Sequence, residues 1–151
     1  MTDRFGEFIK PNWNKFVGHW ESRAAYLADI GEIPRPAVVL MACQFCQSEI
    51  CNGGFLQLFS NSTGMVVPEA IEGFQALGMP ATAALIRDAA SCVGSPYPRD
   101  RDARHRAMAA LSKLDSDLSA LDDLFYQNLA IENGGFEAAA TRYVRGLRGA
   151  S

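Results

Sequence analysis

AVVLMACQFC, residues 37–46, is the most apolar stretch of this 151-residue chain, and Gln44 is the only polar residue inside it. Ten residues are too few to cross a bilayer, which takes about 20. Because apolar side chains occupy every side of a helix drawn through this stretch, the pattern predicts a helix surrounded by other helices. We expect this central helix to run from about Pro36 to Asn52 and to end at Gly53-Gly54.

Apolar residues at helical spacing continue on both sides of the central helix. They predict further helices over residues 11–31, 55–59, 68–78, 80–94, 103–114, 118–129 and 133–147. No stretch alternates apolar and polar residues in the manner of a strand. The predicted fold is therefore all-α, a compact single-domain bundle of about seven or eight helices around the central apolar helix. Residues 1–10 are expected to form a loosely attached N-terminal arm, and residues 11–151 the single helical domain.

The overall composition indicates one folded domain in a reducing compartment. Apolar residues make up 48% of the chain, which is enough for a core. The net charge of -3 is too small to indicate direct nucleic-acid binding. The polar residues 1–7 do not resemble a secretory signal, so we expect a cytoplasmic protein with no membrane association and with free thiols at its four cysteines.

The most distinctive motif is SEICNGGFLQLFSNSTG, residues 48–64. A glycine at the centre can take the left-handed conformation that ends a helix. Glu49, one turn earlier, is placed to accept N–H groups at the start of the following helix. Gln57 and Asn61 are four residues apart and can bridge side chains or loop backbone. These features favour a structural turn between two helices over an exposed binding site, although the sequence leaves both open.

This motif resembles the signature of the DNA mimic protein 19 family. The matching positions are Glu49, Asn52, Gly53, Gly54, Phe55, Gln57, Phe59, Asn61 and Gly64. Residues 69–70, 75–78 and 121–126 also resemble the family, so the likeness covers roughly residues 35–147. The resemblance implies a protein that occupies a DNA-binding protein by imitating DNA charge. Duplex DNA carries one charge per ~1.7 Å, a density far above that of this chain with its fourteen basic residues.

A second ENGGF sequence, residues 132–136, has flanks unlike those of the first. It predicts only another glycine-rich helix boundary.

Metal and catalytic sites are not indicated. Cys43 and Cys46 lie inside the apolar run, which favours buried thiols over a zinc site with its four tetrahedral ligands. The two histidines, His19 and His105, lack ligand spacing, and no phosphate-binding glycine loop follows a strand. We therefore expect no metal, no cofactor and no enzyme activity. If the chain were an enzyme, Glu49 would be the carboxylate beside its most distinctive turn.

Charge is distributed unevenly along the chain. Residues 107–137 hold six acidic residues against the single base Lys113. Such a cluster is commonly a solvated face, but it can also present carboxylates to a basic partner. The candidate partner-binding residues are Asp115, Asp117, Asp122 and Asp123. Replacing both Asp122 and Asp123 with lysine is expected to weaken the complex and leave the helical fold intact.

The leading hypothesis is thus a protein-interaction module that inhibits or regulates a basic partner such as a DNA-binding protein. A homodimer would double the acidic surface. The alternatives are an immunity-type protein that neutralises a toxin enzyme, and an uncharacterised enzyme.

Overall fold

The computed structural model describes residues 5–18 and 20–149, and the predicted all-α fold is confirmed across that part of the chain. The α-helices are α1 (Phe5–Ile9), α2 (Trp13–Phe16), α3 (Arg23–Ile30), α4 (Arg35–Ser60), α5 (Val67–Ala76), α6 (Pro80–Val93), α7 (Arg101–Ala109), α8 (Leu114–Ile131) and α9 (Phe136–Gly149). Short 3-10 helices cover Lys10–Asn12, Ser62–Val66 and Glu132–Gly134. Within these described residues, no helix is long and apolar enough to cross a membrane.

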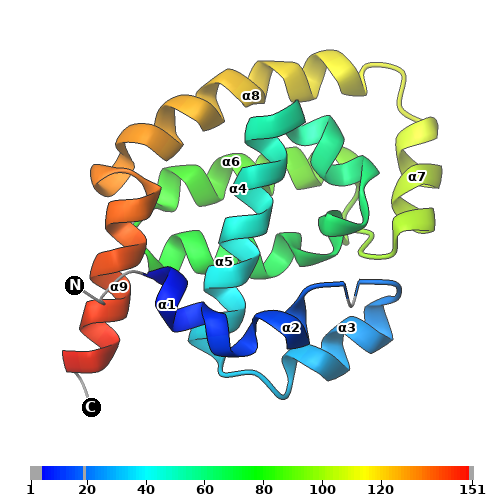
Figure 1. Cartoon of the computed structure of the whole chain (residues 1–151). Helices are drawn as coiled ribbons and strands as arrows, with labels where there is room; N and C mark the ends of the chain where they lie inside the picture. The colour runs from blue at the N-terminus through cyan, green and yellow to red at the C-terminus, as the bar shows by residue number, and fades with distance from the viewer. Residues whose placement is uncertain (1–4, 19, 150–151) are drawn as a thin grey trace.

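Helix α4 is the centre of the molecule, as its sequence predicts. Every side chain from Ala37 to Cys43 is buried, and α4 contacts α1, α2, α5, α7 and α8. Figure 1 shows α8 crossing one end of α4, with α7 and α9 at opposite sides of the bundle. Because α4 has neighbours on all sides, it needs apolar residues all round.

Helices α4 and α5 approach each other closely at Gly73. A Cβ atom at this position would lie 2.4 Å from Cys43 Sγ and 2.7 Å from the carbonyl oxygen of Val39. Only glycine leaves room for this contact, so it sets the separation of the two helices. The next helix, α6, packs against α5 and returns antiparallel to it, so the two form a helical hairpin (Figure 1).

The predicted helix over residues 11–31 is wrong, because the structure interrupts it between α2 and α3. Val17 is extended and Gly18 has a φ of 84°, in the left-handed region that favours glycine. Helix α3 then starts afresh at Ser22, whose hydroxyl accepts the N–H of Ala25 at 3.1 Å. Helical spacing of apolar residues continues across this turn, so the spacing alone does not reveal it.

The predicted N-terminal arm also differs from the structure over the residues that are described. Phe5–Ile9 form helix α1, in which Ile9 is buried. The ring of Phe5 packs edge-on against Phe136 of α9, with 5.4 Å between the ring centroids. Residues 5–9 therefore belong to the packed domain, while residues 1–4 of the predicted arm lie outside the described residues.

A buried ionic cluster ties α3 and α5 to the loop before α7. Glu69 of α5 is 4% exposed and accepts the hydroxyl of Tyr26 at 2.8 Å. The guanidinium of Arg99 donates to both Glu69 carboxylate oxygens, each at 2.8 Å, and lies over the Tyr26 ring. The buried carboxylate is thus paired and hydrogen-bonded, which is the condition for tolerating a charge in the interior.

Candidate functional site

The family motif forms a break within α4. Gly53 has φ -152° and ψ 17°, and Gly54 has φ 79° and ψ -179°, a combination open almost only to glycine. Asp122 of α8 accepts the N–H of Phe55 at 2.9 Å and so caps the second half of α4. A Cβ atom on Gly54 would lie 2.5 Å from the other Asp122 oxygen. The carboxylate predicted to cap this helix start was Glu49, and that prediction is wrong, because Asp122 occupies the position.

The Glu49 carboxylate instead accepts hydrogen bonds from three polar side chains of the motif. It accepts the Gln57 amide at 2.6 Å, the Thr63 hydroxyl at 2.8 Å and the Asn61 amide at 3.3 Å. Gln57 and Asn61 are therefore bridged, as their spacing allows, with Glu49 as the shared acceptor. The half-buried carboxylate connects the first half of α4 to the turn that follows the second half. Asn52, by contrast, is exposed.

A fully buried arginine of α7 donates hydrogen bonds to the C-terminal end of α4. Arg104 donates from Nε to the carbonyl of Phe59 at 2.9 Å and from Nη2 to that of Asn61 at 2.6 Å. Its Nη1 donates to the carbonyl of Arg99. Burial lowers the pKa of Arg104, and the carbonyls at the negative end of α4 favour its charge. Gly64 leaves space for this guanidinium, because a Cβ atom there would lie 2.6 Å from Arg104 Cζ.

Two exposed residues of α7 complete this cap. The Nε of Arg101 donates to the carbonyl of Ser60 at 2.9 Å, and His105 Nε2 lies 2.7 Å from the same oxygen. The carbonyls of three successive residues, 59 to 61, are thus all bound by α7. Gly64 lies against Arg104, and the rings of Phe55 and Phe59 are buried in the core. Most residues of the family motif therefore have a structural role.

The second glycine turn, residues 132–136, caps another pair of helix ends. Glu132 accepts the N–H groups of Ala81 at 2.7 Å and Thr82 at 2.8 Å, at the start of α6. Asn133, with a φ of 52°, donates to the carbonyl of Leu77 at 2.8 Å, at the end of α5. The turn is a helix boundary, as predicted, and it also holds the α5–α6 hairpin.

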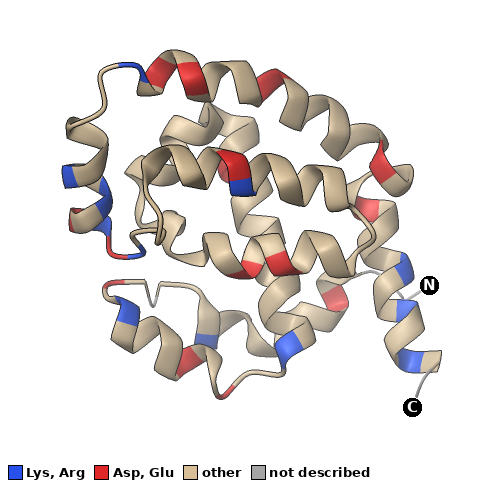
Figure 2. Ribbon diagram, turned by 180° about the vertical axis from the view of Figure 1, so that it is seen from behind, with Lys and Arg blue, Asp and Glu red and all other residues tan. Residues whose placement is uncertain are grey.

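The acidic stretch nominated as a partner surface is divided by the structure. Asp122 and Glu132 are half-buried caps, whereas Asp115, Asp117 and Asp123 are exposed. Figure 2 shows acidic residues along α8 and basic residues on α7 and α9, with charges of both signs on the other helices as well. Because Asp122 caps the second half of α4, we now expect its replacement by lysine to destabilise the fold, and Asp123 is the better position for a charge reversal.

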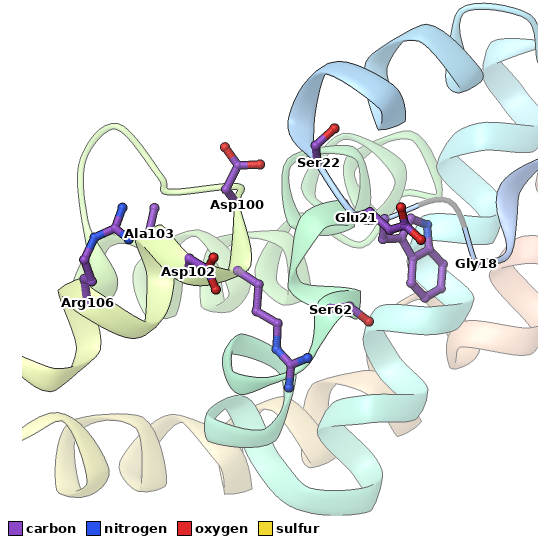
Figure 3. A pocket seen from close by; sticks show the side chains of 10 residues that line it. Gly18, Glu21, Ser22, Ser62, Asp100, Asp102, Ala103 and Arg106 are labelled. Carbon is purple, nitrogen blue, oxygen red and sulfur yellow. The ribbon is translucent and has the colours of Figure 1, made fainter.

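A cleft of about 690 Å³ opens beside the start of α7. It is lined by Gly18, Trp20, Glu21, Ser22, Ser62, Asp100, Arg101, Asp102, Ala103 and Arg106. Figure 3 shows Glu21 and Ser22 on one side and Asp100, Asp102 and Arg106 on the other. Charges of both signs are mixed here, and Asp100 accepts the N–H of Arg23 at 2.7 Å, so the cleft favours no single ligand charge.

The cleft is not among the sites predicted from sequence, because segments far apart in the chain contribute to it. His19, considered above as a possible ligand, lies outside the described residues.

The motif and the surrounding helices are also recognised by comparison with known families. A family model described as DMP19-like protein matches residues 31–147, which is most of the chain. The chain belongs to this family. No curated protein and no solved structure matches it. The family match includes the kink of α4, its caps from α7 and α8, and the exposed acidic residues of α8.

The cysteines of this DMP19-like protein divide into buried and accessible thiols. Cys43 and Cys46 are fully buried in α4, and burial raises the pKa of both. Cys51 is exposed and Cys92 is half-buried. Across residues 5–18 and 20–149, no group of three or more His, Cys, Asp or Glu side chains is placed to hold a metal ion.

We expect a thiol reagent at pH 8 to modify Cys51 first and Cys92 more slowly in the native protein. Cys43 and Cys46 should react only after unfolding, because the thiolate is the reactive form and burial disfavours it. Mass spectrometry before and after addition of guanidinium chloride would count the adducts. Fast modification of Cys43 or Cys46 in the folded protein would contradict this arrangement.

Proposed function

We propose that this DMP19-like protein is a protein-binding module that inhibits or regulates a basic partner, of the DNA-binding class, through the outer surface of α8. The observation that carries the proposal is the charge of this helix. Asp115, Asp117 and Asp123 are exposed on it, and residues 114–131 include no lysine or arginine. An acidic helix attracts a basic surface and speeds its association, an effect that salt weakens.

The distribution of charge over the rest of the molecule supports a directional surface. Helices α7 and α9 each carry three arginines, whereas residues 114–131 of α8 carry acidic charges alone (Figure 2). A basic partner is therefore attracted more strongly to α8 than to α7 or α9. We place this function in the cytoplasm, where the free thiols would stay reduced.

The number of exposed carboxylates limits the likeness to DNA. An 18-residue helix such as α8 is about 27 Å long. Duplex DNA carries about 16 charges over that length, compared with three exposed carboxylates on α8. The proposed surface therefore acts as a short acidic contact, and a homodimer would only double it.

The test is a pull-down from native lysate with the wild-type protein and a charge-reversed variant, Asp117→Lys with Asp123→Lys. Glu7→Lys with Glu32→Lys is the matched control, since both glutamates are exposed and lie outside α8. We expect the α8 variant to lose its partner and the control to keep it. Duplex DNA added as a competitor should displace a DNA-binding partner.

Circular dichroism must show equal helix content in the two variants, because Asp117 also lies in the favourable first turn of α8. Equal capture by wild type and both variants would contradict the proposed surface.

A further inference from the structure

The outer side of α8 carries large apolar side chains as well as acids. Six large hydrophobic side chains are exposed in the described part of the chain, and four of them lie between residues 111 and 131. Leu124 is 49% exposed and Ile131 is 73% exposed, the two highest values of the six. Their concentration on one segment distinguishes them from the scattered surface leucines that need no explanation.

The two most exposed residues align along the helix. Leu124 and Ile131 are seven residues apart, or about two helical turns, and therefore share one side of α8. Exposed Ala120 and Gln127 lie between and beside them on the same side. These four residues form the outer stripe. The core-facing side of α8 is separate and is formed by Leu114, Leu118 and Phe125.

Carboxylates border the outer stripe. Exposed Asp117 precedes Leu124 by two turns, and exposed Asp123 precedes Gln127 by about one turn. The stripe thus presents the apolar side chains of Leu124 and Ile131 on either side of Gln127, has carboxylates at its border, and spans about three helical turns. A small residue such as Ala120 allows the backbone of another helix to approach closely.

We propose that the outer stripe binds one amphipathic α-helix of a protein partner. Apolar residues of that helix pack on Leu124 and Ile131, and its lysine or arginine residues pair with Asp117 and Asp123. This inference rests on the proposed function and specifies the element of the basic partner that makes contact. Charge favours a basic helix as the occupant, because the exposed carboxylates of Asp117 and Asp123 attract lysine and arginine residues and residues 114–131 include no base that would repel them.

The probe is a synthetic 18-residue helical peptide of leucine, alanine and lysine, with its leucines on one side and its lysines flanking them. A scrambled peptide of the same composition has the same charge and no apolar side. We expect isothermal titration to show at least about tenfold tighter binding of the helical peptide. We also expect the methyl resonances of Leu124 and Ile131 to shift.

Leu124→Asn with Ile131→Asn should reduce the affinity for the helical peptide to that for the scrambled one. Leu27→Asn with Leu56→Asn is the matched control, because both leucines are 38% exposed and lie on other helices. The control variant should bind as wild type does.

The outcomes separate this inference from the proposed function. If both peptides bind with equal affinity and Asp117→Lys with Asp123→Lys abolishes that binding, the helix-binding stripe is overturned. The acidic contact of the proposed function would then still stand. Binding of neither peptide, or binding unaffected by the charge reversal, would contradict both. A dimer in sedimentation experiments that Leu124→Asn with Ile131→Asn dissociates would also overturn the inference, because a second copy would then cover the stripe.

Discussion

Replacing Arg104 with leucine is expected to lower the free energy of unfolding by about 3–5 kcal/mol. The guanidinium donates to three backbone carbonyls, two of them at the C-terminal end of α4. Each buried carbonyl left without a donor costs about 1–3 kcal/mol of stability. The leucine offsets part of this loss, because it avoids the desolvation penalty of burying the arginine charge. Guanidinium denaturation followed by circular dichroism measures the change.

Arg106→Leu is the matched control for Arg104→Leu. Arg106 lies on the same helix but is exposed, so its replacement should change the free energy of unfolding by less than about 0.5 kcal/mol. A loss for Arg104→Leu no larger than for Arg106→Leu would show that the buried arginine does not hold the end of α4.

Glu69→Leu is expected to have an effect of similar size, about 3–5 kcal/mol. The substitution removes the carboxylate that binds both Arg99 nitrogens and the Tyr26 hydroxyl. Arg99 is then left largely buried with its charge uncompensated, which is the costly way to break a buried ion pair. Thermal or chemical unfolding of the variant provides the measurement.

A neighbouring glutamate of α5 provides the comparison for Glu69. Glu72 binds Arg35 through two hydrogen bonds, but both side chains are about half exposed. Solvent screens such a pair, so Glu72→Leu should cost less than about 1 kcal/mol. Equal losses for Glu69→Leu and Glu72→Leu would indicate that burial does not distinguish the two carboxylates.

The parts of the fold that sequence predicts correctly depend on local patterns. The apolar run of residues 37–46 has no polar side to expose, so a central helix is the arrangement that buries it. Gly53 and Gly54 likewise indicate the break in α4 without knowledge of any other segment. Local spacing was less informative around Gly18, where apolar residues keep a helical period across a left-handed turn.

The roles that sequence does not reveal belong to side chains that act on distant helix ends. Asp122 caps Phe55 from 67 residues away, and Glu132 caps Thr82 from 50 residues away. In the sequence, both are simply members of an acidic stretch, indistinguishable from exposed Asp123. Only the packing of α8 across α4 and α6 separates the carboxylates that support the fold from those that face outward.

Capping by distant side chains links the formation of one helix to the docking of another. The start of α6 obtains its acceptor from Glu132, and the second half of α4 depends on Asp122 at one end and Arg104 at the other. Before α7 and α8 dock, these helix ends lack partners and fray. The domain should therefore unfold in a single cooperative transition, in which losing α8 also loosens the centre of the bundle.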